Sequence, residues 1–228
     1  MALYAIADLH LSLGEEKPMD VFRGWDRYHE RLEQNWRTLV HPEDTVVVAG
    51  DISWAMSLAE SRTDFAFLNG LPGQKLLLKG NHDYWWGTRK KMDAFFADCG
   101  FDTIRIIHNS AERYESTALC GTRGWFFDAE PDHDKKVLTR EVGRLERSIA
   151  AGRAMGLEPM VFLHYPPVVS GARCPEIMDA LHANGVTRCF YGHLHGPSIR
   201  RAVQGEAEGI RFRLISCDAV NFTPVRIG

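Results

Sequence analysis

Residues 75–83 read Lys-Leu-Leu-Leu-Lys-Gly-Asn-His-Asp, so polar side chains follow directly after a short apolar run. Three consecutive leucines suit a strand that is buried on both faces. The glycine after the run permits a tight turn, and asparagine, histidine and aspartate are side chains that bind metal ions. Because open α/β sheets form their sites beyond the carboxyl ends of strands, this stretch predicts an α/β fold with a site at one sheet edge.

Four further motifs repeat this arrangement along the chain: Asp8-Leu9-His10, Gly50-Asp51, His164 and Gly192-His193-Leu194-His195. Alternate side chains of an extended segment point the same way, so each Asp-x-His or His-x-His pair can reach one site. A carboxylate such as that of Asp51 has two oxygens and can bridge two cations. The candidate metal ligands are Asp8, His10, Asp51, Asn81, His164, His193 and His195.

The number and chemistry of these ligands suit two divalent metal ions held side by side. Oxygen and imidazole ligands without a thiolate favour Mn, Fe, Zn, Co or Ni over Ca, and of these we favour Mn. A metal pair activates water and holds a phosphoryl group during in-line displacement. The motifs therefore predict an enzyme that acts on phosphoester bonds.

Short β-rich runs alternate with stretches of helical periodicity over the whole chain. The predicted strands are residues 3–7, 45–49, 75–78, 103–107, 117–120, 160–163, 188–191 and 211–216. The predicted helices are residues 25–40, a helix after Ser57, a helix from about Thr88, residues 138–155, and a helix from Pro175 to Asn184. The length of 228 residues suits one domain over residues 1–228, in which residues 125–158 could form a small lid.

Composition restricts the environment and the partners. The five cysteines are scattered and form no Cys-x-x-Cys motif, which favours a reducing, cytoplasmic location. The apolar start of the chain is too short for a signal peptide, and no run approaches the roughly 18 residues of a membrane span. The net charge of −3 gives no bulk attraction to nucleic acid or to a membrane. The sequence does not indicate the oligomeric state.

The five motifs, in this order, resemble the pattern of the calcineurin-like metallophosphoesterase superfamily: Asp-x-His, Gly-Asp, Gly-Asn-His-Asp/Glu, His and Gly-His-x-His. The resemblance implies a four-layer α/β/β/α sandwich of two mixed sheets flanked by helices. It implies hydrolysis of a phosphomonoester or phosphodiester by a hydroxide that bridges two metals. By the same resemblance, Asp8, His10 and His195 hold one metal, Asn81, His164 and His193 hold the other, and Asp51 lies between them.

The resemblance also assigns roles to the two residues after Asn81. His82 matches the family's catalytic histidine, and Asp83 is expected to orient it. One departure concerns Trp54 in Gly50-Asp51-Ile52-Ser53-Trp54, where many members carry a polar residue. Together with Asn-His-Asp-Tyr-Trp-Trp at residues 81–86, this resembles a bacterial branch of predicted phosphohydrolases, so the substrates of better-known branches do not transfer.

Several residues close to the motifs could contact substrate. The aromatic residues Trp54, Tyr84, Trp85, Trp86, Trp125, Phe126 and Phe127 could form a wall against a planar group. Packing behind the site is the alternative that we favour, with Trp54 and Trp86 the best candidates for exposure. Arg123 could reach a non-reacting phosphate, although a surface role is favoured, and Tyr165 could line the pocket.

The expected partner is a small phosphoester, which could be nucleotide-like. Two other functions are compatible with these motifs. A non-catalytic metal-binding scaffold of the same fold would be expected to lose motif residues, and this chain keeps them all. A nuclease would need an extended basic surface, and the negative net charge argues against one.

Overall fold

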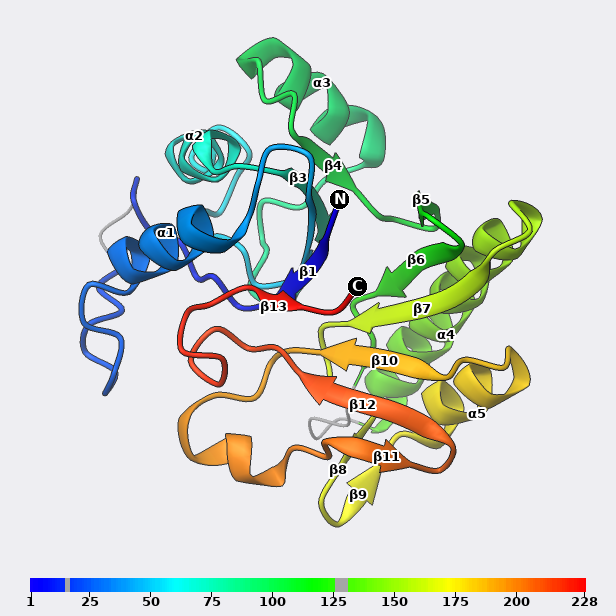
Figure 1. Cartoon of the computed structure of the whole chain (residues 1–228). Coiled ribbons are helices and arrows are strands. Elements are labelled where there is room, and N and C mark those ends of the chain that lie inside the picture. Colours follow the sequence, from blue (N-terminus) through cyan, green and yellow to red (C-terminus); the bar gives the residue numbers. More distant parts are fainter. Residues whose placement is uncertain (15–16, 126–130) are drawn as a thin grey trace.

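The computed structural model describes residues 1–14, 17–125 and 131–228, and its strands form two large mixed sheets (Figure 1). The smaller sheet has the order β13-β1-β2-β3-β4, formed by β1 (Leu3–Ile6), β2 (Thr45–Ala49), β3 (Gln74–Leu78), β4 (Ile104–Ile106) and β13 (Val225–Arg226). The larger sheet has the order β11-β12-β10-β7-β6-β5, formed by β5 (Ala111–Tyr114), β6 (Thr117–Thr122), β7 (Glu158–Leu163), β10 (Arg188–Tyr191), β11 (Gly205–Ala207) and β12 (Ile210–Leu214). A separate hairpin joins β8 (Val168–Val169) to β9 (Ala172–Arg173).

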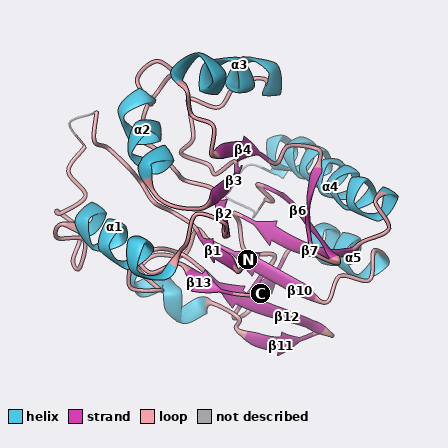
Figure 2. Ribbon diagram, turned by 45° about the horizontal axis from the view of Figure 1, so that its top comes forward, coloured by secondary structure: helices cyan, strands magenta, loops and turns pink. Residues whose placement is uncertain are grey.

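Helices cover the outer face of each sheet, so the molecule has the layers α/β/β/α (Figure 2). The smaller sheet is covered by α1 (Tyr28–Leu39), α2 (Arg62–Gly70) and α3 (Arg89–Cys99). The larger sheet is covered by α4 (Pro131–Ala154) and α5 (Pro175–Ala183), and a 3-10 helix, η1, spans Gly196–Arg201. The predicted four-layer fold is confirmed.

Burial on both faces explains the apolar runs that predicted the strands. In β1, Tyr4 and Ile6 pack under the helices. Leu3 and Ala5, which alternate with them, pack in the layer between the two sheets, where Phe162 of the larger sheet also lies. Alternate side chains of a strand point to opposite faces, so a strand between two apolar layers has no polar position.

Parallel pairing brings the ends of the central strands to the same edge. The strands β1, β2, β3 and β4 are parallel neighbours, as are β6, β7, β10 and β12. The antiparallel strands β13, β5 and β11 lie at edges. The loops after β1 and β2 continue the pairing beyond the sheet, since the Leu11 N–H donates to the Ile52 carbonyl and the Trp54 N–H donates to the Leu11 carbonyl.

The predicted strands coincide with eight observed strands, with ends that agree within two residues. The predicted helix at residues 25–40 begins later, at Tyr28, because Arg27 has a left-handed backbone (φ 48°) that a helix cannot include. Helix α4 begins at Pro131, earlier than the predicted residue 138. The sequence missed β5, β11 and β13, which are short edge strands with charged residues, and the two-residue strands β8 and β9.

The domain division stays a prediction. Within the proposed lid at residues 125–158, residues 126–130 lie outside the described residues. Helix α4 supplies most of the remainder, and its Leu145 and Ile149 are fully buried in the core cluster beneath the larger sheet. None of the helices in the described part of the chain combines the length and apolar character that a bilayer crossing requires.

Candidate metal centre

The seven predicted ligands all follow strand ends and meet at one edge of the two sheets. Asp8 and His10 follow β1, Asp51 follows β2 and Asn81 follows β3. His164 follows β7, and His193 and His195 follow β10. The structure therefore brings together residues that are up to 187 positions apart, from Asp8 to His195.

Strained backbone marks the turns that carry these side chains. Asp8, His10, Asp51 and His193 have positive φ angles of 60°, 46°, 50° and 71°. A left-handed conformation is unfavourable for residues other than glycine, and such residues cluster at functional sites. The approach of the loops is also close, because a Cβ atom at Gly80 would overlap the carboxylate of Asp51.

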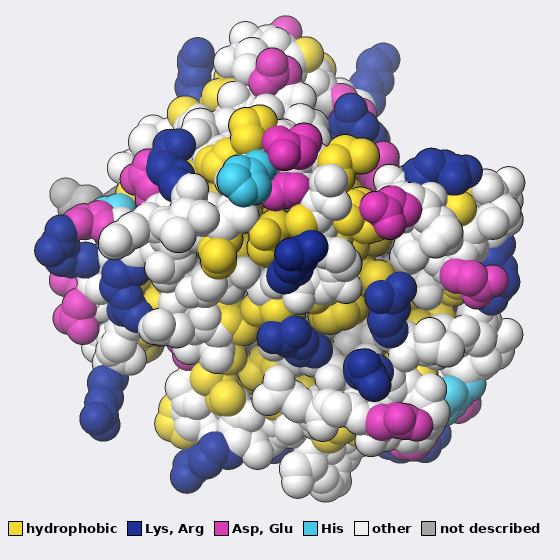
Figure 3. All heavy atoms as spheres, viewed as in Figure 1, with side chains coloured by type: hydrophobic (Ala, Val, Ile, Leu, Met, Phe, Trp, Pro, Cys, Tyr) yellow, Lys and Arg dark blue, Asp and Glu magenta, His cyan; other side chains and the backbone are white. Residues whose placement is uncertain are grey.

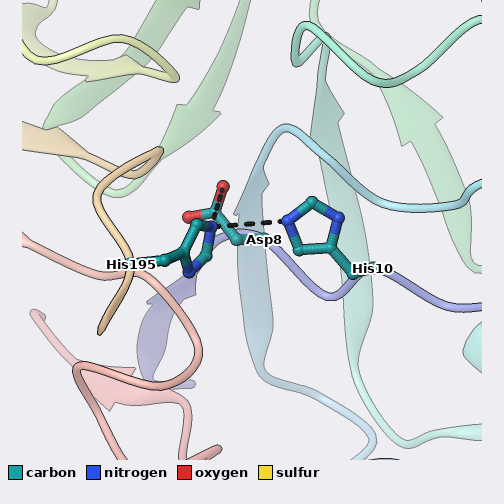
Figure 4. A group of neighbouring side chains, drawn as sticks. All are labelled: Asp8, His10 and His195. Carbon is teal, nitrogen blue, oxygen red and sulfur yellow. Dashed lines mark hydrogen bonds and ion pairs between the residues drawn. The ribbon is translucent and has the colours of Figure 1, made fainter. Parts of the chain in front are cut away.

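Asp8, His10 and His195 form the first ligand cluster (Figure 4). One ligand atom from each lies within 4.8 Å of the others. The two Nε2 atoms of His10 and His195 are 3.3 Å apart, and His195 Nε2 is 3.5 Å from Asp8 Oδ1. These separations fit side chains that share one cation.

A second cluster adjoins the first. Its ligand atoms come from Asp8, Asp51 and His164 and lie within 4.8 Å of one another. Asp51 Oδ2 lies between the two clusters, 3.8 Å from His10 Nε2 and 3.4 Å from His164 Nε2. Asn81 Oδ1 is 2.6 Å from His164 Nε2 and 3.1 Å from His193 Nδ1. Asp51 thus occupies the position of a ligand shared by two sites.

The donor set fits two divalent cations. Imidazole nitrogens and carboxylate or amide oxygens converge, without a thiolate, which is the mixture that transition metals accept. No lysine or arginine lies within hydrogen-bonding distance of Asp8 or Asp51 in the described part of the chain. Among the described residues, the basic groups against these two buried carboxylates are the candidate histidine ligands themselves.

The protonation of the centre reflects burial and crowding. Burial raises the pKa of Asp51 to about 8, and the negative charge of Asp8 adds to the rise. Burial also acts to raise the pKa of Asp8, but His195 and the neighbouring histidines hold it well below its usual range. Burial acts to lower the pKa of His195, but Asp8 and Asp218 raise it to about 10. Burial lowers the pKa of His10 to about 3. Asp51 and His195 therefore carry protons at neutral pH.

We expect metal binding to release protons and to strengthen as pH rises. A ligating carboxylate must be ionised and a ligating imidazole neutral, whereas Asp51 and His195 are protonated below pKa values of about 8 and about 10. Calorimetric titration with Mn²⁺ in two buffers of different ionisation enthalpy at pH 7 should show release of about one to two protons per protein. Affinity that does not change between pH 6.5 and pH 8, with no proton release, would contradict this protonation.

Asp83 supports the centre through the backbone. Its carboxylate is fully buried and accepts hydrogen bonds from the backbone N–H groups of Asp51 (3.0 Å), Ile52 (2.8 Å) and Gly80 (2.7 Å), and from Trp85 Nε1 (3.0 Å). These bonds tie the loop after β2 to the loop after β3. The sequence predicted that Asp83 orients His82, but in the described structure the buried His82 Nδ1 has no hydrogen-bond partner.

His82 itself lies beside the clusters. Its backbone N–H donates to Asp51 Oδ1 at 2.8 Å, and its ring is 5.9 Å from that of His10 and 4.5 Å from that of Trp54. Burial lowers its pKa to about 4, with smaller contributions from His164 and His193. The ring is therefore neutral at pH 7.

Asp218 is a member of the site that the sequence analysis missed. Its Oδ1 is 2.9 Å from His195 Nδ1, and its Oδ2 accepts from the Gly196 N–H at 2.8 Å. A carboxylate on the far nitrogen of a ligating histidine fixes the ring's orientation and raises its basicity. In the sequence, Asp218 is an acidic residue two positions after the predicted strand at 211–216. It is not part of an Asp-x-His or His-x-His motif, so no spacing marked it as a site residue.

Replacing Asp218 by Asn is expected to weaken metal binding about 10- to 100-fold. Asn keeps the size of the side chain but removes the charge that holds His195, and His195 is expected to hold only one of the two metals. Calorimetric titration with Mn²⁺ should therefore show one weakened site and one unchanged site. The matched control is Asp98→Asn, because Asp98 is exposed on α3. Equal Mn²⁺ affinities of the Asp218 variant and the wild type would contradict a role for Asp218 in the metal site.

The residues proposed to contact substrate fall at different places. Trp54 is half-buried, and its ring stacks on His10 at 5.0 Å. Tyr165 is buried, with its ring 4.4 Å from that of His193. Both side chains therefore adjoin predicted ligands.

The other proposed contacts are engaged elsewhere. Trp86 packs against Trp85 and lies 6.2 Å from His108. Arg123 forms an ion pair of 3.5 Å with the buried Glu141 and is 18% exposed, so it is not the surface residue that we favoured. Of the remaining aromatic residues, Trp85 is buried, Tyr84 is exposed, and the Trp125 ring lies 5.5 Å from that of Tyr165. Phe126 and Phe127 lie outside the described residues.

A basic groove lies apart from the ligand clusters. Figure 3 shows Lys and Arg side chains gathered at the centre of the face seen in Figure 1. A cavity of about 530 Å³ on the larger sheet is lined by Arg188, Arg211, Arg213 and Arg226. Arg188 starts β10, whose other end leads to His193. The lining contains none of the candidate ligands, and Arg188 is five residues of extended chain, roughly 17 Å, from His193.

The four-layer sandwich is the metallophosphoesterase fold, and sequence comparison identifies the family. The model of the calcineurin-like phosphoesterase family matches residues 1–197. This chain therefore belongs to the calcineurin-like phosphoesterase family, and the resemblance seen in the five motifs is confirmed. No curated protein is significantly similar to the chain in sequence.

Solved structures of low sequence identity share the fold. AQ665, a protein of unknown function from Aquifex aeolicus, is 15% identical with a TM-score of 0.50, over 99% of this chain and 95% of its own. TT1561 of Thermus thermophilus is 11% identical with a TM-score of 0.53, over 85% of this chain and 81% of its own. Phosphopantetheinyl Hydrolase (PptH) from Mycobacterium tuberculosis is 18% identical with a TM-score of 0.49, over 94% of this chain and 88% of its own. Identities this low bear on the fold alone, and the shared fold is argued from AQ665 and TT1561, whose TM-scores are 0.50 and 0.53.

Proposed function

We propose that the protein is a hydrolase of small phosphoesters that uses two divalent metal ions, with Mn²⁺ as the favoured ion and the cytoplasm as its location. The observation that carries the proposal is the pair of ligand clusters, which share Asp8 and adjoin at Asp51 in a member of the phosphoesterase family. Asp8, His10 and His195 would hold one ion. Asn81, His164 and His193 would hold the other, with Asp51 between them.

When bound, two such cations supply a nucleophilic hydroxide at neutral pH and neutralise charge on the phosphoryl group. The residues of the chain prepare the site for this chemistry. Asp83 fixes the loops that carry Asp51 and Asn81 through backbone hydrogen bonds. Asp218 holds His195 in one orientation. The short connections from strand to ligand keep the clusters rigid, which preorganised charge stabilisation requires.

We assign to His82 the stabilisation of negative charge on the phosphoryl oxygens. Its ring is neutral at pH 7, because burial lowers its pKa to about 4, and a neutral imidazole donates a hydrogen bond through one nitrogen. Proton transfer to the leaving oxygen is the second role that the resemblance allows. That role requires the charge of the bound phosphate to raise the pKa of His82 towards neutrality.

The alternatives are less well supported. A non-catalytic metal-binding scaffold would be expected to lose motif residues, and this chain keeps all of them, including His82. A nuclease would use a basic surface that runs to the reacting centre. The lining of the arginine groove includes none of the candidate ligands, so we favour a small phosphoester over nucleic acid.

The test is hydrolysis of p-nitrophenyl phosphate and bis(p-nitrophenyl) phosphate by metal-stripped protein, with and without added Mn²⁺. We expect turnover only with the metal, and the ratio of the two rates will separate monoester from diester preference. Zn²⁺, Co²⁺ and Ni²⁺ belong in the same series, because ligand chemistry alone does not choose among them. Absence of turnover with every metal, when metal analysis shows two ions bound, would favour the scaffold.

A further inference from the structure

A cavity of about 450 Å³ opens directly beside the first ligand cluster. Its inner wall includes His10, His82 and His195. This volume lies within the range of about 300–1,000 Å³ that is usual for small-molecule sites. Because the candidate ligands form its wall, a group that fills this cavity lies next to any phosphoryl group held by them. The cavity is therefore continuous with the proposed reaction centre.

The rest of the lining is mostly apolar, formed by Met19, Phe22, Trp25, Trp54 and Pro197. The Trp54 ring stacks on His10 at 5.0 Å with an interplanar angle of 24°. The Trp25 ring contacts His10 and His195 edge-on, at 5.9 Å and 5.8 Å. Trp25 is only 4% exposed and packs on Phe222, so this wall is firmly held. The cavity is a preformed aromatic recess rather than a gap that closes on itself.

Its outer rim leaves apolar surface in water. Phe22 lines the cavity and is 56% exposed. Met19 lies deeper, and its sulfur accepts from Trp54 Nε1 at 3.2 Å. When a ligand covers an exposed large apolar side chain at the mouth of an apolar cavity, the apolar surface leaves water, and this favours binding.

Few polar groups in the recess can hold a hydrophilic ligand. Asp218, the carboxylate in the lining, is committed to His195 Nδ1 and to the Gly196 N–H. Arg23 is exposed at the rim, and Lys17 Nζ lies 4.4 Å from the centre of the Trp54 ring. A sugar or glycerol moiety in this recess would leave several hydroxyl groups without partners, which is unfavourable.

We propose that this cavity binds the alcohol part of the phosphoester, and that this part is an apolar group about the size of an aromatic ring system. The inference rests on the proposed phosphoesterase function and narrows its substrate class. The phosphoryl group would lie at the metal ligands, and its organic substituent would fill the recess formed by Met19, Phe22, Trp25 and Trp54. The cationic side chains at the rim suit a substrate that carries negative charge.

The test compares substrates whose reactivity is matched. Ethyl phosphate and 2-phenylethyl phosphate lose alcohols of similar acidity, so a rate difference reports on recognition of the phenyl group. Methyl ethyl phosphate and methyl 2-phenylethyl phosphate extend the comparison to diesters. With Mn²⁺, we expect kcat/KM to be about 10- to 30-fold higher for the phenylethyl compounds, as burial of a phenyl group predicts.

Phe22→Ser should lower the ratio between the phenylethyl and ethyl compounds about threefold or more. Val21→Ser is the matched control, because Val21 is the adjacent residue, is 71% exposed and is not part of the cavity lining. We expect the control to keep the wild-type ratio. A ratio near one in the wild type, or an equal loss in both variants, would overturn the inference while leaving the phosphoesterase function intact.

A binding measurement separates this inference from the function on which it rests. Fluorescence anisotropy of 2-naphthol, excited beyond tryptophan absorption, reports occupancy of the cavity without turnover. We expect saturable binding to the wild type and to Val21→Ser, and binding weakened at least about threefold by Phe22→Ser. If no ester is hydrolysed but this pattern appears, the recess is supported and the proposed function fails. If naphthol does not bind, the recess proposal fails, whatever the activity.

Discussion

Asp51→Asn is expected to lower kcat/KM by about 10³-fold or more for whichever nitrophenyl ester the wild type hydrolyses faster. Asp51 Oδ2 lies between the clusters, 3.8 Å from His10 Nε2 and 3.4 Å from His164 Nε2. The substitution removes one of two carboxylates at the centre, and with it the bridging charge. We expect metal analysis to show fewer than two ions per protein.

The fold should survive this change. The backbone N–H of Asp51 donates to Asp83, and that bond does not depend on the side chain. The amide oxygen of asparagine can still accept from the His82 N–H, as Asp51 Oδ1 does at 2.8 Å. Asp51 is also held in its protonated form when no metal is bound, so a neutral amide suits the metal-free centre. A thermal unfolding midpoint equal to or above that of metal-free wild type, together with the loss of turnover, is the expected pair of results.

Near-wild-type turnover of Asp51→Asn would contradict the assignment of this residue as the shared ligand. Asp98→Asn provides the control for removal of one carboxylate, because Asp98 lies on the exposed surface of α3. We expect that control to retain activity and two bound metals. Loss of activity in both variants would point to a general effect of charge rather than to the metal centre.

The sequence predicted the ligand clusters because each signal is local. An apolar run followed at once by a polar residue marks the end of a strand buried on both faces, as at Leu78 and Asn81. Parallel pairing then brings such ends together without further information. The strained backbone at Asp8, His10 and Asp51 was not predictable in this way, because only a small fraction of Asp and His residues adopt positive φ and no local pattern marks which ones.

Other features depend on contacts between distant segments. Asp218 joins His195 only because the loop after β12 returns beside the loop after β10. The arginine groove needs the register of the parallel pair, which places Arg188 opposite Arg211. Neither spacing along the chain nor composition contains that register. The net charge of −3 therefore concealed a local basic surface.

The aromatic recess shows the same limit. Met19 lies outside every predicted element, and the sequence placed Trp25 in a helix. The structure places the segment of these two residues in turns, where Trp25 packs beside His195. Trp54, which follows Asp51 by three residues, was named with Trp86 as a best candidate for exposure, although packing behind the site was favoured for the aromatic residues as a group. Proximity in sequence to a strong motif identified one wall of the recess and not the other.

His82→Ala is expected to lower kcat by about 10²- to 10⁴-fold while two metals remain bound. The His82 ring lies 5.9 Å from the His10 ring, close enough to meet a phosphoryl group held by the clusters. His82 also lines the cavity beside the first ligand cluster, so a substrate bound there would contact its ring. Metal content by mass spectrometry and single-turnover kinetics would separate loss of chemistry from loss of metal.

His108→Ala is the matched control, because His108 is also half-buried and burial also lowers its pKa, yet it packs near Trp86 rather than among the ligands. The choice of ester separates the two roles of His82. If the ring only stabilises phosphoryl charge, the loss should be similar for nitrophenyl and alkyl esters. If it protonates the leaving oxygen, the loss should be much larger for the alkyl esters, because a nitrophenolate departs without a proton. Full activity of His82→Ala towards both ester types would exclude both roles.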